Sequence, residues 1–96
     1  MMKYLDWDAQ KNEKLKEERG VGFEEIASAI VEGNILGTVP HPNQRRYKSQ
    51  NIFIVELHDY AYAVPFVEDD KKIFLKTIFP NRKYTREFIE KRRRDI

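Results

Sequence analysis

Residues 51–79, NIFIVELHDYAYAVPFVEDDKKIFLKTIF, decide the fold. They hold three runs rich in β-branched and aromatic residues, at 51–58, 60–67 and 72–79, which is the composition of β-strands. Both connections, at His58-Asp59 and at the polar EDDK turn, have hairpin length, so consecutive strands are expected to pair antiparallel. Pro65 has no amide hydrogen, so its strand is expected to lie at an edge or to be bulged at that point.

Two helices are predicted ahead of these strands. Residues 9–20 are rich in good helix formers, and Gly20 ends the run. Residues 22–34 repeat apolar side chains at spacings of three and four, which gives a helix one apolar face. The second of these helices is therefore expected to pack on the sheet.

A third helix is predicted after the strands, at residues 85–94, with Thr85 as its N-cap. Short strands are expected at 4–7 and 35–39. This order predicts a single α+β domain over residues 1–96. It is expected to be an antiparallel meander sheet with two N-terminal helices and one C-terminal helix packed on one face.

Strict alternation sorts the side chains of residues 72–79 onto two faces. The helix-covered face is expected to hold Ile73, Leu75, Thr77 and Phe79, and the other face Lys72, Phe74, Lys76, Ile78 and Pro80. The small residues Ala61 and Ala63 indicate close packing of a helix against their side of 60–67. An open face with Lys76, Glu56 and the tyrosines suits an RNA groove, or is simply a half-exposed sheet.

Composition excludes several kinds of site. The chain has no cysteine, so it has no disulfide and no thiolate metal site, and its glycines form no phosphate-binding loop. His41 and His58 are not at ligand spacing, and Asp6 and Asp8 flank a helix start, so neither a metal nor a cofactor is predicted. No apolar run suits a signal peptide or a membrane span, so a cytoplasmic protein without membrane association is expected.

Charge is unevenly distributed along the chain. Residues 1–40 carry a net charge of −3 and residues 41–96 a net charge of +5, with the basic excess after residue 80. Such a cluster indicates a phosphate-bearing or acidic protein partner. A merely solvated basic surface is the other interpretation.

Arginine, lysine, histidine and tyrosine suffice to cleave RNA without a metal. The 2′-hydroxyl attacks the adjacent phosphate, and the protein holds the phosphate, stabilises developing charge and moves protons. Candidates lie in the 41–50 loop and at the junction after the last strand. The candidate catalytic residues are His41, Arg46, Lys76, Arg82 and Lys83, and the candidate RNA contacts are Arg45, Tyr47, Tyr84 and Arg86. Arginine holds phosphate bidentately, whereas Lys76, His41 or Tyr84 would assist proton transfer.

Three segments resemble a known family. YLDWDAQKNEKLKEERGVGFEEIASAI (4–30) is similar to the opening of BrnT-type toxins of bacterial type II toxin–antitoxin systems. The matching positions are Trp7-Asp8, Lys11-Asn12, Leu15, Arg19-Gly20 and Phe23-Glu24-Glu25. QRRYKSQNIFIVEL (44–57) and FLKTIFPNRKYTREF (74–88) are similar to the family's basic entry into the sheet and its strand-to-helix junction.

The resemblance implies a RelE-like ribonuclease fold and a metal-independent endoribonuclease toxin that cleaves mRNA, free or ribosome-associated, and inhibits translation. It also implies a cognate antitoxin, a ribbon-helix-helix protein through which alone the complex binds operator DNA. Arg46 matches the family's loop arginine with Tyr47 beside it, and Arg82 and Lys83 match its basic pair. The strand end FPNRK lacks the family's Ser/Ala-Arg pair, so the general acid and base stay open.

The alternative is a non-catalytic module that binds RNA or an acidic protein with the same basic surface. No helix-turn-helix or ribbon pattern supports direct DNA binding. The position of Arg46 relative to Arg82 separates the alternatives: one shared groove favours catalysis, and opposite sides favour binding alone.

Overall fold

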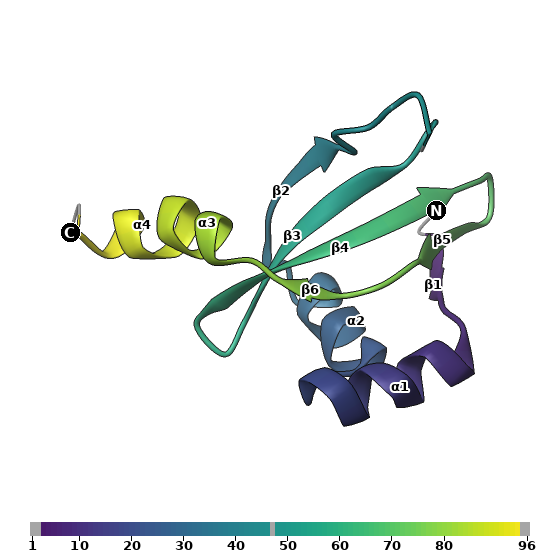
Figure 1. The fold of residues 1–96 in the computed structure, drawn as a ribbon, viewed down its shortest axis with the longest axis horizontal. Coiled ribbons are helices and arrows are strands. Elements are labelled where there is room, and N and C mark those ends of the chain that lie inside the picture. Colours follow the sequence, from purple (N-terminus) through teal and green to yellow (C-terminus); the bar gives the residue numbers. More distant parts are fainter. Residues whose placement is uncertain (1–2, 47, 95–96) are drawn as a thin grey trace.

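The computed structural model describes residues 3–46 and 48–94 of the chain. Its elements are β1 (Tyr4–Asp6), α1 (Ala9–Arg19), α2 (Phe23–Val31), β2 (Ile35–Pro40), β3 (Asn51–Leu57), β4 (Tyr60–Glu68), β5 (Lys72–Leu75), β6 (Phe79–Pro80), α3 (Arg82–Tyr84), a π-helical stretch η1 (Thr85–Glu90) and α4 (Lys91–Arg94). The strands described form one sheet in the order β1-β5-β4-β3-β2, with β6 paired to β4 beyond the end of β5 (Figure 1). The α+β class is thus confirmed.

The sheet is mixed rather than a purely antiparallel meander. From β2 to β5 each strand pairs antiparallel with the next, as predicted. β1 runs parallel to β5, with Tyr4 opposite Lys72, so the prediction was wrong at this edge. A parallel pair needs a long crossover rather than a turn, and here residues 7–71 separate the two strands.

The β3–β4 hairpin turns at the predicted position. His58 and Asp59 both have positive φ angles, 54° and 61°. Two successive residues of this kind match the twist of antiparallel strands and so close a tight hairpin. Across it, Leu57 lies opposite Tyr60 and Asn51 opposite Phe66, which fixes the register of both strands.

Helices cover both faces of the sheet, whereas one face was predicted. One cluster of buried residues joins α1 and α2 to the sheet through Leu15, Phe23, Ile26, Val55 and Val64. A second cluster lies on the opposite face, where Ile89 of η1 packs with Ile54, Ala61 and Ala63. The predicted close packing on the two alanines is confirmed, but the C-terminal segment makes it, and this segment projects away from α1 and α2 (Figure 1).

The tyrosines of β4 lie on the α2 side. Tyr62 packs partly against the first cluster, and burial raises the pKa of its hydroxyl. Glu56 lies opposite Ala61, on the other face, and pairs with Arg92 at 3.2 Å. The expected open face shared by Lys76, Glu56 and the tyrosines is therefore wrong.

Asn12 ties α1 to α2 from a buried position. Its side-chain oxygen accepts a hydrogen bond from the backbone N–H of Phe23 at 2.7 Å, and its amide donates to Glu24 at 2.8 Å. The side-chain oxygen of Asn12 thus satisfies an N–H at the start of α2 that has no partner within the helix. The backbone N–H of Glu24, and then Asn12, lower the pKa of the Glu24 carboxyl. Asn12 therefore has a structural role.

Replacing Asn12 with alanine is expected to lower the free energy of unfolding by about 1–3 kcal/mol, because the N–H of Phe23 would be left buried without an acceptor. Urea denaturation of both proteins measures the difference. Gln10→Ala, at an exposed position of the same helix, is the control and should change stability by less than about 0.5 kcal/mol. Equal stability of the Asn12 and Gln10 variants would contradict the role assigned to Asn12.

A bulge interrupts the strand that was predicted at 72–79. Leu75 lies opposite Phe66 in β5, but Phe79 lies opposite Ala63 in β6, so one extra residue has entered between them. The Lys76 N–H donates to the Pro65 carbonyl at 2.8 Å, and proline has no N–H to return. The prediction placed the irregularity in the strand of Pro65, but β4 keeps its register with β3 through Pro65, and the extra residue lies in the neighbouring segment.

The bulge reverses the facing of the residues that follow it, because one inserted residue turns a strand over. Ile78 is fully buried in the α1–α2 cluster, whereas Phe79 is 44% exposed. Their predicted faces are therefore both wrong. Phe79 now presents its ring on the same side as Lys76.

Candidate nucleic-acid interface

The loop between β2 and β3 is ordered by its own hydrogen bonds. The His41 N–H donates to the Gln50 carbonyl at 3.1 Å, which closes the base of the loop. The Gln44 amide bridges the His41 and Gln50 carbonyls at 2.7 and 3.3 Å. The Arg46 N–H donates to the Asn43 side chain at 3.2 Å. These bonds hold His41 at the sheet and present Arg46 at the exposed end of the loop.

A further hydrogen bond within this loop selects the tautomer of His41. The backbone N–H of Asn43 donates to His41 Nδ1 at 3.1 Å. A ring nitrogen that accepts a hydrogen bond carries no hydrogen, so a neutral His41 carries its hydrogen on Nε2. His41 therefore presents Nε2–H as a hydrogen-bond donor.

His41 and Lys76 lie on one cavity of about 340 Å³, the His41 cavity. It is lined by Lys11, His41, Gln50, Pro65, Lys76, Thr77 and Phe79. Two candidates that lie 35 positions apart in the sequence thus meet beside an exposed aromatic ring. The cavity combines cationic groups, an imidazole and an aromatic surface.

The bulged segment beside this cavity contains a buried polar atom that lowers the stability of the fold. The Thr77 hydroxyl oxygen is buried and has no hydrogen-bond partner among the residues that the structure describes. An unsatisfied buried polar group costs about 1–3 kcal/mol. Irregularities of this kind in strands are common next to active sites, where they redirect side chains.

The first turn of the C-terminal helical segment positions Arg82 and Lys83. Asn81, not Thr85, is the N-cap: its side chain accepts from the Tyr84 N–H at 2.8 Å. Thr85 is buried, and its hydroxyl accepts from the Ala61 N–H at 2.9 Å, which fixes the segment to β4. Arg82, Lys83 and Arg86 are exposed.

Tyr84 is half-buried. Its ring centroid lies 6.0 Å from that of Phe88, and both rings pack against the second core cluster. The ring thus contributes to the docking of the C-terminal segment. The prediction for Tyr47 falls outside the described residues.

The two groups of arginines lie at opposite ends of the sheet. Arg45 and Arg46 follow β2, at the end where Asn51 lies opposite Phe66. Arg82 begins at the other end, where the Asn81 N–H donates to the Ala61 carbonyl. Five strand residues separate these points on β4, which is roughly 17 Å. Arg46 and Arg82 therefore do not meet around one phosphate.

A second cavity, of about 570 Å³, adjoins the first and is called the lysine trough. It is lined by Asp8, Gln10, Lys11, Lys14, Phe74 and Lys76, so Lys11 and Lys76 border both hollows. Lys11 and Lys14 are three apart on α1 and so share a helix face. The sequence contains that spacing, but only the fold directs this face toward Lys76.

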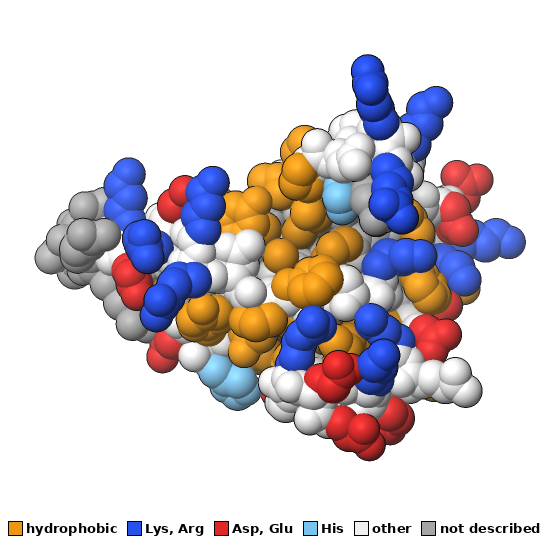
Figure 2. All heavy atoms as spheres, viewed as in Figure 1, with side chains coloured by type: hydrophobic (Ala, Val, Ile, Leu, Met, Phe, Trp, Pro, Cys, Tyr) orange, Lys and Arg blue, Asp and Glu red, His pale blue; other side chains and the backbone are white. Residues whose placement is uncertain are grey.

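Aromatic rings accompany the cations of this region. Lys76 Nζ lies 5.7 Å from the Phe74 ring centroid, and the Arg19 guanidinium lies 4.9 Å from that of Phe79. Lys72 also lies near Phe74, at 5.8 Å, but it is engaged by Asp6. The hydrogen bond to Asp6 raises the pKa of the Lys72 ammonium group. Figure 2 shows apolar side chains gathered at the centre of this face with lysines and arginines around them.

Comparisons with known protein families, curated proteins and solved structures found no match. Among residues 3–46 and 48–94, no group of three or more histidines or carboxylates is arranged to hold a metal ion. No helix in the described part of the chain is long and apolar enough to cross a membrane.

Proposed function

We propose that this protein is a metal-independent endoribonuclease, the toxin of a bacterial toxin–antitoxin pair, and that it cleaves mRNA at the His41 cavity. One observation carries the proposal: His41, Lys76 and Lys11 surround a single cavity beside the exposed ring of Phe79. Cations that hold phosphate, a histidine N–H that donates a hydrogen bond to developing charge and a ring that stacks on a base are groups that RNA cleavage uses.

The reaction follows from the chemistry of these groups. The 2′-oxygen forms a bond to the adjacent phosphorus, its proton passes to solvent water, and the bond from phosphorus to the 5′-oxygen breaks. His41 Nε2–H donates a hydrogen bond to that leaving oxygen, which takes its proton from solvent water, and the ammonium groups of Lys76 and Lys11 stabilise the negative charge of the transition state. The products carry a 2′,3′-cyclic phosphate and a 5′-hydroxyl.

The arginines hold the strand on either side of the cleaved bond. Arg46 lies at one end of the sheet and Arg82 with Lys83 at the other, roughly 17 Å apart along β4. Arginine binds phosphate strongly and stays charged. These residues therefore act on the flanking phosphates, and His41 acts on the reacting phosphate.

The resemblance of residues 4–30, 44–57 and 74–88 to BrnT-type toxins supports the assignment to a toxin–antitoxin pair. The proposed partner is a ribbon-helix-helix antitoxin, through which the complex binds operator DNA. Copurification with the product of the adjoining gene tests the partner, and failure of the two to associate would count against it.

The separation of Arg46 from Arg82 favours a second candidate, a module that binds RNA without cutting it. In this case the same surface binds a single-stranded RNA, and His41 has only a structural role. The two candidates predict the same binding but different products.

Cleavage chemistry distinguishes them. Purified protein in EDTA is expected to cut a single-stranded RNA, alone or on a translating ribosome, and to leave a cyclic phosphate detectable by mass spectrometry. An RNA with a 2′-deoxynucleotide at the cut position should resist, because the attacking oxygen is missing. RNA that stays intact both alone and on the ribosome would contradict the ribonuclease proposal. If this intact RNA is also bound by the protein, the result would support the second candidate, a module that binds RNA without cutting it.

A further inference from the structure

We propose that the lysine trough binds the phosphates of a single RNA strand and extends the substrate site from the His41 cavity along α1. This inference rests on the proposed function, for which it names the path of the substrate. Lys11 and Lys14 hold successive phosphates, while Lys76 lies where the trough meets the cavity.

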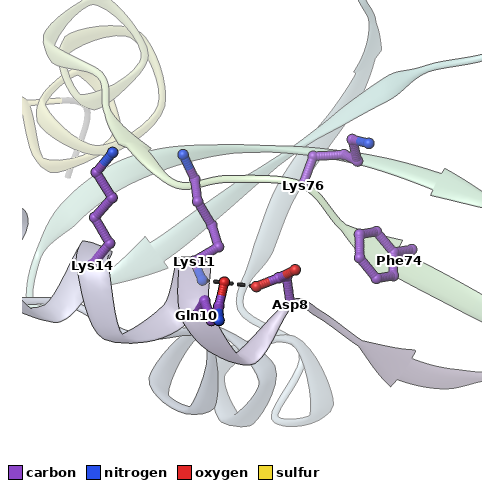
Figure 3. A pocket seen from close by; sticks show the side chains of 6 residues that line it. All are labelled: Asp8, Gln10, Lys11, Lys14, Phe74 and Lys76. Carbon is purple, nitrogen blue, oxygen red and sulfur yellow. Dashed lines mark hydrogen bonds between the residues drawn. The ribbon is translucent and has the colours of Figure 1, made fainter.

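The geometry joins the two hollows into one path. Lys11 and Lys76 line both, so a strand that leaves the cavity enters the trough between them. Lys11 and Lys14 extend from α1 toward the segment that carries Lys76 and Phe74 (Figure 3). The Asp8 carboxylate also lines the trough, and one of its oxygens accepts the Lys11 N–H at 2.9 Å as the helix cap.

The charges of the trough call for an anion. Among the residues described, no carboxylate pairs with the ammonium groups of Lys11, Lys14 or Lys76. Lys16, on the same helix, contrasts with them, because it pairs with Glu24 at 3.2 Å. Three ammonium groups around one hollow raise the local concentration of an anionic ligand.

The aromatic rings favour RNA over an acidic peptide. Phe74 lines the trough beside Lys76, and Phe79 lines the cavity with 44% of its surface exposed. A cationic groove with aromatic rings binds single-stranded nucleic acid, because phosphates take the cations and bases stack on the rings. An acidic peptide would use the cations alone.

Fluorescence anisotropy with a 2′-O-methyl RNA oligonucleotide tests the trough. This probe cannot be cleaved, because its 2′-oxygen is blocked, so binding is measured apart from catalysis. Lys11→Gln with Lys14→Gln is expected to weaken binding about tenfold. It should also make the plot of log K against log salt shallower by about 1.4, the value for two lost phosphate contacts on a single strand.

Matched controls separate the trough from net charge. Lys71→Gln with Lys91→Gln removes the same charge from exposed positions outside the trough and should change affinity less than about twofold. Lys11→Arg with Lys14→Arg should retain binding, and thermal melting should show that every variant is folded. Unchanged affinity in the glutamine pair, an equal loss in the control pair, or equally tight binding of polyglutamate would each overturn the trough as an RNA site.

Failure of the two proposals can be distinguished. Binding that depends on Lys11 and Lys14, together with RNA that is never cut, would reject the ribonuclease and keep the trough. Wild-type protein that binds no RNA would reject both.

Discussion

Replacing His41 with asparagine is expected to slow RNA cleavage about 100- to 1,000-fold, which is the contribution of a well-placed hydrogen-bond donor to developing negative charge. The imidazole offers Nε2–H to the leaving oxygen, and the shorter asparagine side chain does not extend to the position of Nε2. The asparagine oxygen can still accept the backbone N–H of Asn43, so the loop should keep its shape. Single-turnover cleavage at saturating protein concentration measures the chemical step.

The second histidine provides a matched control. His58 lies in the β3–β4 turn, exposed, with Nε2 3.3 Å from a Glu25 carboxylate oxygen. Its φ angle of 54° suits asparagine, which tolerates the left-handed region better than most residues. His58→Asn should therefore cleave within about twofold of the wild-type rate. A His41→Asn protein as fast as His58→Asn would show that His41 does not stabilise the leaving oxygen.

Local signals in the sequence were sufficient for most of the sheet. The strands 51–58 and 60–67 and the turn between them follow from alternation, branching and hairpin length, and all three are present. The small side chains of Ala61 and Ala63 indicated a close helix, and Ile89 packs on them. Each of these features depends on a few neighbouring residues.

The features that build the site depend on distant residues. The bulge after Leu75 arises where the neighbouring strand presents Pro65, and it alone brings Phe79 to the exposed face beside Lys76. A regular period of two predicts the reverse for every residue after the insertion. The pairing of β1 also depends on distant residues, because Tyr4 lies opposite Lys72 of β5, 68 positions later in the chain.

The orientation of Lys11 and Lys14 also could not be predicted from the local sequence. On the sequence they belong to a charged surface helix, and nothing local distinguishes them from Lys16. Asn12 and Leu15 are buried and set the rotation of α1, which directs Lys11 and Lys14 into the trough and Lys16 toward Glu24. The packing of a helix thus decides which of its lysines can reach a ligand.

The second large effect is expected from Ile89→Ala, which should lower the free energy of unfolding by about 2–4 kcal/mol. Ile89 is fully buried and belongs to the cluster with Ile54, Ala61 and Ala63, against which Phe88 packs from a partly buried position. Truncation leaves a cavity against two alanines, whose small side chains cannot move to fill it. Urea denaturation followed by circular dichroism measures the loss.

Glu90→Ala is the control, since Glu90 is exposed and adjacent in the same π-helical stretch. It should change stability by less than about 0.5 kcal/mol. Amide hydrogen exchange then distinguishes destabilisation of the whole domain from undocking of the C-terminal segment alone. If only the segment undocks, the amides of residues 82–92 exchange faster while those of β3 stay protected. Either result supports docking through Ile89, and it would displace Arg82 and Lys83 from the end of the sheet. Unchanged stability together with unchanged exchange in Ile89→Ala would mean that the C-terminal segment does not depend on this contact. The hydrogen bonds of Asn81 and Thr85 to Ala61 and the packing of Tyr84 and Phe88 would then hold the two basic residues in place.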